Sequence, residues 1–286
     1  MNVVTQVVVI LLISISLSMS ALATDTAKEE RWAKQVNDFL VNGKTQWLNT
    51  NIHKFLSIYR PAMNPTFNMK PIGGVILLHG RGVHPNWPQV IQPLRTGLPN
   101  YGWSTLSLQM PILPSGSTGE DYIHLFKEVP ARIKAGLDYL SKHGINNVIL
   151  IGHNLGSNMG SNYLSSHNDS RVRAFVGIGM VGEKQPTSKF ALDNVWSLLR
   201  MNVPILNVYG SDDNPNVLAS VDRLAFAISS YSNSKKTQHS QQIKINDANQ
   251  SFKNHEDKLL QIITTWISNF SFDNSSNSLT SLVNHK

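Results

Sequence analysis

Residues 148–156 read VILIGHNLG, an apolar run that enters a turn bounded by two glycines. Asn147 to Ile151 has the continuous apolar character of a strand buried on both faces, and Leu155 to Ser165 is predicted to be a helix. The residue at the centre of so sharp a turn needs a strained backbone, and asparagine tolerates left-handed angles better than most residues. The segment therefore predicts a tight strand–turn–helix unit with Asn154 at its tip.

Strands and helices alternate on both sides of this turn. The predicted strands are 74–78, 104–110, 147–151, 174–179, 204–209 and 242–245, and the predicted helices are 89–98, 121–142, 155–165, 190–201, 217–229 and 256–269. Such alternation is typical of an α/β fold with a mostly parallel sheet and helices on both faces. Upstream, Glu29–Asn42 has helical spacing, and with Thr45–Tyr59 it suggests that residues 24–70 form an N-terminal helical extension of a 71–270 domain.

A glycine-bounded turn of this kind, written G-x-S-x-G, is the nucleophile elbow of the α/β-hydrolase fold. Asn154 stands where that motif has its serine, so the turn is kept while the nucleophilic hydroxyl is lost. Upstream, 79–82 (HGRG) ends a strand and is similar to the loop that gives one N–H of an oxyanion hole, here that of Arg81. The second N–H is expected from Leu155, and the pair could bind an anion or a carbonyl oxygen.

The remaining catalytic positions follow in the order acid, then histidine. Asp213 follows the predicted strand 204–209 and is the expected orienting acid, with Asp212 as an alternative. The loop after the last strand has no histidine, and Gln250 stands in the expected place. His255 is a reserve base, although it also fits an exposed residue at a helix start. Glutamine cannot accept a proton from a nucleophile at neutral pH, so catalysis by a triad is not expected.

Four stretches resemble a family of bacterial α/β-hydrolase-like proteins that is described as a domain of unknown function. They are 30–43 (ERWAKQVNDFLVNG), 79–111 (HGRGVHPNWPQVIQPLRTGLPNYGWSTLSLQMP), 151–157 (IGHNLGS) and 203–213 (VPILNVYGSDD). Together the resembling parts cover nearly all of the chain after its N-terminal segment. The resemblance implies an α/β-hydrolase fold and an envelope location, and it implies no substrate.

The N-terminal segment is typical of an export signal. Residues 7–19 (VVVILLISISLSM) are apolar but too short and serine-rich for a comfortable membrane span, and Ala21-Leu22-Ala23 supplies small residues for cleavage after Ala23. We therefore expect residues 1–23 to be a signal peptide of a periplasmic or secreted protein, with an uncleaved N-terminal membrane anchor as the alternative. Residues 271–286 are rich in serine and asparagine and are expected to be disordered.

Composition limits the function classes further. The chain has no cysteine, so disulfides, thiolate metal sites and cysteine nucleophiles are excluded. Its ten histidines are dispersed without metal-ligand spacing, and no cofactor is expected. The net charge of +7 comes from scattered residues, which is typical of a solvated basic surface. Peripheral contact with an anionic membrane surface remains an alternative, and nucleic acid is not expected as a partner.

Two functions follow from these observations. The first is a catalytically silent, exported protein of the hydrolase fold that binds an ester- or lipid-like small molecule, or another envelope protein, in the former catalytic cleft. The second is an atypical hydrolase of esters or amides that works without the elbow serine, with His255 as base. Ser157 lies one turn beyond Asn154 and is a poor replacement nucleophile, because it is displaced from the tip of the turn.

Overall fold

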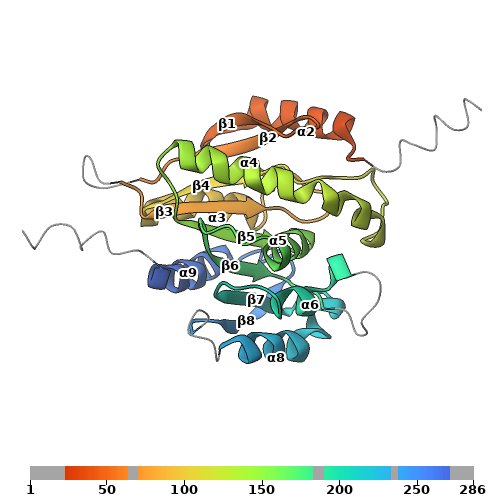
Figure 1. Ribbon diagram of the computed structural model, residues 1–286, viewed down its shortest axis with the longest axis vertical. Helices are drawn as coiled ribbons and strands as arrows, with labels where there is room; N and C mark the ends of the chain where they lie inside the picture. Colours follow the sequence, from red (N-terminus) through yellow and green to blue (C-terminus); the bar gives the residue numbers. More distant parts are fainter. Residues whose placement is uncertain (1–22, 64–69, 183–189, 233–237, 271–286) are drawn as a thin grey trace, which may run out of the picture.

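The computed structural model describes residues 23–63, 70–182, 190–232 and 238–270. The expected signal peptide, apart from Ala23, and the expected disordered tail therefore lie outside the described residues. Within the described part, the elements form one twisted sheet with helices packed against it (Figure 1).

The sheet contains eight strands in the order β1-β2-β4-β3-β5-β6-β7-β8. The pairs β1–β2 and β2–β4 are antiparallel, whereas every pair from β4 to β8 along the sheet is parallel. The strands are β1 Lys44–Asn49, β2 Lys54–Arg60, β3 Gly73–Leu78, β4 Trp103–Leu108, β5 Val148–His153, β6 Val172–Ile178, β7 Ile205–Asp212 and β8 Gln241–Asn249. The carboxyl ends of the parallel strands meet at one edge, which is where ligands bind in open α/β sheets.

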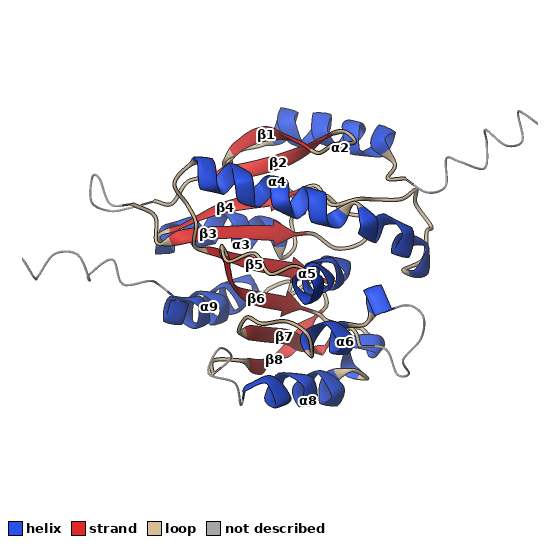
Figure 2. Cartoon of the chain, in the orientation of Figure 1, coloured by secondary structure: helices blue, strands red, loops and turns tan. Residues whose placement is uncertain are grey.

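Helices cover both faces of the sheet (Figure 2). One apolar core joins α4, α5, α6 and α8 to the sheet, and a second joins α3 and α9 to the opposite face. The α-helices are α2 Thr26–Phe39, α3 Ile91–Gly97, α4 Val129–Lys142, α5 Leu155–Ser166, α6 Asn194–Leu198, α7 Pro215–Leu218, α8 Val221–Ser232 and α9 Glu256–Ile267. Short 3-10 helices are η2 Leu98–Tyr101, η3 Glu120–Lys127, η4 Phe190–Leu192 and η5 Ser268–Phe270. The expected mostly parallel α/β architecture is thus confirmed.

The predicted helical extension is wrong for Thr45–Tyr59, which forms the β1–β2 hairpin. The hairpin turns where the Thr50 N–H donates to the His53 carbonyl oxygen at 3.0 Å. Both faces of β2 are covered: Phe55 lies in the core under α4, and Leu56 packs with α2 on the other face. Burial on both faces removes the alternation of apolar and polar residues that identifies a half-buried strand. The apolar spacing therefore resembled that of a helix.

Three predicted helices are divided. Residues 121–142 split into η3 and α4 at Pro130, which lies in the first turn of α4 and cannot donate a backbone hydrogen bond to a preceding turn. Residues 190–201 split into η4 and α6, because the Asp193 side chain accepts a hydrogen bond from the Val195 N–H and starts a new helix. Residues 217–229 fall in α7 and α8. The other predicted elements differ only at their ends.

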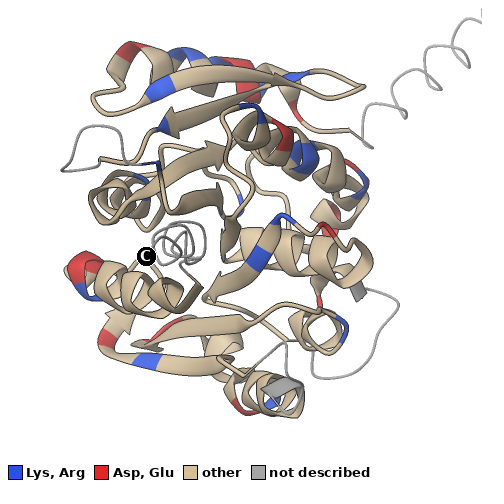
Figure 3. Ribbon diagram, turned by 60° about the vertical axis from the view of Figure 1, so that its left-hand side comes forward, with Lys and Arg blue, Asp and Glu red and all other residues tan. Residues whose placement is uncertain are grey.

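Charged residues are spread over the whole ribbon (Figure 3). The described helices include none that is long and apolar enough to span a bilayer.

Candidate functional site

The turn after β5 has a strained backbone that its two glycines permit. Asn154 has φ 52° and ψ −121°, a region that side chains other than glycine rarely adopt. A Cβ atom on Gly156 would lie 2.2 Å from the Leu78 carbonyl oxygen, and one on Gly152 would lie 2.4 Å from the Gly156 oxygen. Both glycines are therefore required by the close packing of β3, β5 and α5.

The Asn154 side chain is turned back onto the start of α5. Its Oδ1 accepts the Leu155 N–H at 2.8 Å, while its own backbone N–H donates to the Ile178 carbonyl oxygen at 2.9 Å. Leu155 is the residue expected to give one N–H of an oxyanion hole. In this structure that N–H is already engaged by the neighbouring amide oxygen.

The loop after β3 lies against the same turn. A Cβ on Gly80 would lie 3.3 Å from the Asn154 Cβ and 3.7 Å from the His153 Nδ1. Arg81, the other expected oxyanion-hole residue, points its side chain outward and donates from Nη1 to the Ser117 carbonyl oxygen at 3.1 Å. The structure therefore brings this loop beside Asn154, as the sequence predicts, with the Arg81 side chain exposed.

His79 fixes the position of this loop. Its Nδ1–H donates to the Gly80 carbonyl oxygen at 2.8 Å, and its Nε2 accepts the Met110 N–H at 2.9 Å. These two bonds define a neutral ring that ties the end of β3 to the end of β4. Burial lowers the pKa of His79 to about 3, so the ring stays uncharged at neutral pH. The sequence analysis did not assign His79 any role.

Asp213 is buried at the end of β7, but its carboxylate is held by backbone groups. Oδ1 accepts the Asn214 N–H at 2.7 Å, and Oδ2 accepts the Gly210 N–H at 3.3 Å. Burial raises the pKa of the Asp213 carboxyl despite these two bonds. Asp213, which the sequence predicts to be the orienting acid, therefore lies near the strand ends, and among the described residues both of its carboxylate oxygens accept backbone N–H groups.

The loop after β8 holds a glutamine beside this acid. Asp212 and Asn249 are paired across β7 and β8, so the following residues, Asp213 and Gln250, leave the sheet side by side. The Gln250 side chain is exposed. The backbone carbonyl oxygen of Gln250 accepts the His153 Nε2–H at 3.0 Å. His255 immediately precedes α9, and its Nδ1 donates to the carbonyl oxygen of Lys253, two residues earlier, at 3.2 Å.

His153 is the functional-site residue that the sequence analysis missed. It immediately precedes Asn154, and its ring bridges the end of β5 to the loop where a catalytic histidine was sought. Its Nδ1 is buried without a hydrogen-bond partner, and burial lowers its pKa to about 4. The sequence feature that could have identified His153 is its position in G-H-N-L-G, next to the predicted tip of the elbow. Ser157, in contrast, is fully buried and its hydroxyl bonds to backbone oxygens of Gly152 and Ile178.

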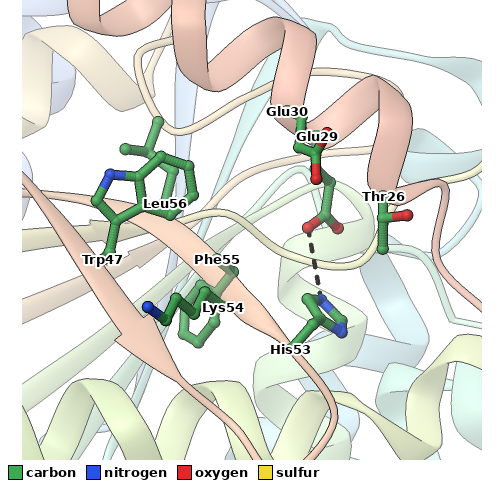
Figure 4. A pocket seen from close by; sticks show the side chains of 8 residues that line it. All are labelled: Thr26, Glu29, Glu30, Trp47, His53, Lys54, Phe55 and Leu56. Atoms are coloured by element: carbon green, nitrogen blue, oxygen red, sulfur yellow. Dashed lines mark ion pairs between the residues drawn. The ribbon is translucent and has the colours of Figure 1, made fainter.

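Three hollows lie near the start of α2 in the described part of the chain. The largest of them, of about 720 Å³, is lined by Ala23–Ala27, Leu113, Pro114, Ser117, Asp121 and His124. A second, of about 570 Å³, lies between α2 and the β1–β2 hairpin and is lined by Glu29, His53 and Trp47 among others (Figure 4). The third, of about 390 Å³, adjoins the loop after β3 and is lined by Lys28, Arg81, Gly82, Pro114, Ser115, Gly116, Ser117 and Tyr122. No group of three or more His, Cys, Asp or Glu residues suited to a metal ion occurs among the described residues.

The strand order, the strained turn after β5 and the loop after β3 define an α/β-hydrolase fold. Solved structures agree: an α/β serine hydrolase without lid from Xanthomonas campestris shares 11% identity with a TM-score of 0.58, over 81% of this chain and 96% of that one. An esterase from Pyrococcus furiosus shares 13% with a TM-score of 0.61, over 83% and 96%. A putative α/β hydrolase from Agrobacterium tumefaciens shares 16% with a TM-score of 0.59, over 79% and 96%.

The chain belongs to the family described as protein of unknown function DUF3530, which it matches over residues 8–122 and 117–269. No curated protein matches the sequence.

Proposed function

We propose that this protein is a catalytically silent member of the hydrolase fold that is exported and acts by binding a ligand or an envelope partner. The observation that carries the proposal is the contact of Asn154 Oδ1 with the Leu155 N–H at 2.8 Å. Asn154 thereby stands in place of a nucleophilic serine, and its side chain occupies the N–H group that would be one donor of an oxyanion hole. A donor of that kind contributes about 10²–10³-fold to the rate of acyl transfer.

The base of a triad is also missing from its expected place after β8, where residues 246–254 include no histidine. Asp213 is paired with backbone N–H groups, and Gln250 leaves the sheet beside it. Because a glutamine amide cannot take up a proton at neutral pH, a serine alone at position 154 would not regain the base. The hollow lined by Lys28 and Arg81 adjoins the loop that lies against Asn154, which supports binding of an anionic, lipid-like ligand beside the elbow.

The test is hydrolysis of short-chain nitrophenyl esters by the wild type and by an Asn154→Ser/Gln250→His variant. We expect no turnover by the wild type and measurable turnover by the double variant, because the strained turn and the acid are already present. The matched control carries the same substitutions at exposed positions, Asn202→Ser/Gln238→His, and should stay silent. Wild-type turnover that survives Asn154→Ala and is absent from a mock preparation would overturn the proposal.

A second candidate is an atypical hydrolase, and the unpartnered Nδ1 of His153 is the observation that favours it. This nitrogen lies next to the elbow and could accept a proton from a water molecule. Its pKa of about 4 makes it a weak base at neutral pH, so we rank this function second. Ester turnover that is abolished in His153→Gln, while His124→Gln keeps the full rate, would favour the atypical hydrolase.

A further inference from the structure

Three charged side chains meet in the interior between α2 and the start of α4. Arg132 Nη2 lies 2.9 Å from Glu29 Oε1 and 3.5 Å from Glu128 Oε2, and all three residues are buried. The fourth member is His53, whose Nε2 lies 2.7 Å from Arg132 Nη2 and 3.6 Å from Glu29 Oε2.

Glu29 is the more closely paired of the two carboxylates in this cluster. Arg132 and His53 both lie beside Glu29, whereas Glu128 is paired with Arg132 at the longer distance of 3.5 Å. Burying a charge without a close partner is costly, and buried ions in proteins are normally paired. Burial raises the pKa of the Glu29 carboxyl even though Arg132 lies beside it. Glu128 is therefore the carboxylate that would gain most from a second cation.

The backbone nitrogen of Thr24 faces Glu128. It donates to Glu128 Oε1 at 3.1 Å, and the Thr24 hydroxyl donates to Glu29 Oε1 at 2.6 Å. The same hydroxyl oxygen accepts the Ile112 N–H at 2.9 Å, which attaches Thr24 to the segment after β4. Thr24 is 7% exposed, whereas the preceding residue, Ala23, is exposed. The change from an exposed to a buried residue thus falls at the Ala23–Thr24 bond.

The sequence points independently to the same bond. Ala21-Leu22-Ala23 follows the apolar run 7–19 and has the small residues that a signal peptidase needs for cleavage after Ala23. The bond predicted to be cut from sequence alone is therefore the bond whose nitrogen faces a buried carboxylate in the fold.

We propose that hydrolysis of the Ala23–Thr24 peptide bond converts the Thr24 nitrogen into an α-ammonium group that forms a buried ion pair with Glu128. A peptidase of the export pathway adds water across the bond, Ala23 leaves with the new carboxylate, and the Thr24 amine takes up a proton. An α-amino group has an ordinary pKa of about 7.7–8.0, so it is charged at neutral pH. Removal of the leader then gives Glu128 a second cationic partner beside Arg132.

The first test is the mass of the protein purified from the envelope of cells that express the full chain. We expect a mature chain that starts at Thr24. A mature chain that starts elsewhere, or an uncleaved one, would overturn the proposal.

The second test compares two purified forms that differ by one residue, one starting at Thr24 and one at Ala23. The additional residue moves the ammonium group away from Glu128 and leaves a neutral peptide N–H in its place. We expect the Thr24 form to unfold at a midpoint about 5 °C higher at neutral pH. The difference should disappear at alkaline pH, because the ion pair is lost once the amine deprotonates. Equal midpoints at neutral pH would contradict the ion pair.

Glu128→Gln identifies the partner. In this variant the two forms should unfold at the same temperature, whereas in the control Glu30→Gln, on the exposed side of α2, the difference should persist. If Glu128→Gln does not fold, the alternative experiment is to label the two wild-type forms with an amine-reactive reagent. The reagent should label the α-amino group of the Ala23 form rapidly and that of the Thr24 form slowly, and equal rates would exclude a buried ammonium group.

Discussion

The turn after β5 and the loop after β8 lie at the same edge of the sheet but differ in what they retain. The turn keeps a strained backbone, φ 52° and ψ −121° at Asn154, between glycines that pack directly against β3 and α5. The loop after β8 has no histidine in residues 246–254, and Gln250 there is exposed. This difference shows that packing against β3 and α5 constrains the backbone of the elbow. The side chain of Gln250 points into solvent, so packing does not constrain which residue stands there.

The largest effect is expected from Gly156→Ala. The added methyl carbon would lie 2.2 Å from the Leu78 carbonyl oxygen, so β3 and α5 must separate. We expect a loss of at least about 4 kcal/mol in the free energy of unfolding, or failure to fold. Denaturant titration followed by circular dichroism measures it. Gly119→Ala is the control, since its Cβ meets no heavy atom within 4 Å. Equal stability of the two variants would break the packing argument.

Acidification should destabilise the elbow side of the sheet through His79. Its folded-state pKa of about 3 lies below the ordinary 6.5, so the unfolded chain takes up the proton first as the pH falls. His79 alone should therefore remove about 3 kcal/mol of stability between pH 6.5 and pH 4. The measurement is the pH dependence of unfolding in wild type and in His79→Gln, which lacks this contribution. His124→Gln, at an exposed site, should keep the wild-type slope.

Substitutions of Asn154 should separate strain from capping. Alanine keeps the strained backbone and loses the bond from Oδ1 to the Leu155 N–H, so Asn154→Ala should cost about 1–2 kcal/mol. Asn154→Gly loses the same bond but relieves the strain, so its stability should stay within about 0.5 kcal/mol of wild type. Thermal unfolding of both variants tests this order. A glycine variant as unstable as the alanine variant would mean that the backbone strain is not significant.

The smallest effect is expected in the loop after β8. Gln250→Ala removes an exposed side chain and keeps the carbonyl oxygen that His153 contacts, so stability should change by less than about 0.5 kcal/mol. The same denaturant titration applies. A larger loss would show that the loop, like the elbow, is constrained by its packing, and the contrast between the two regions would fail.

The sequence predicted the centre of the sheet well because β3, β5 and β6 are short, largely apolar runs bounded by turn residues. The hairpin was missed because Leu48 and Phe55 face one core while Leu56 and Ile58 face another, which hides the strand period. At the site, the glycine spacing located Asn154. The bridge from His153 to Gln250 could not be predicted, since its two residues are distant in sequence and the partner is a backbone oxygen. The role of a single buried histidine such as His79 could not be predicted either, because no local sequence pattern indicates its contacts with β4.

The edge strands of the sheet are β1 and β8, and neither is suited to pairing with a further strand. Lys44 begins β1, and only Leu48 of its six residues is buried. Along β8, Lys244 and Asp247 are exposed, and the register with β7 is interrupted between Gly210 and Asp212. Charges and irregular pairing at an edge oppose edge-to-edge addition and aggregation. The outer strands of this sheet are therefore poor templates for pairing with a strand of a second copy of the chain.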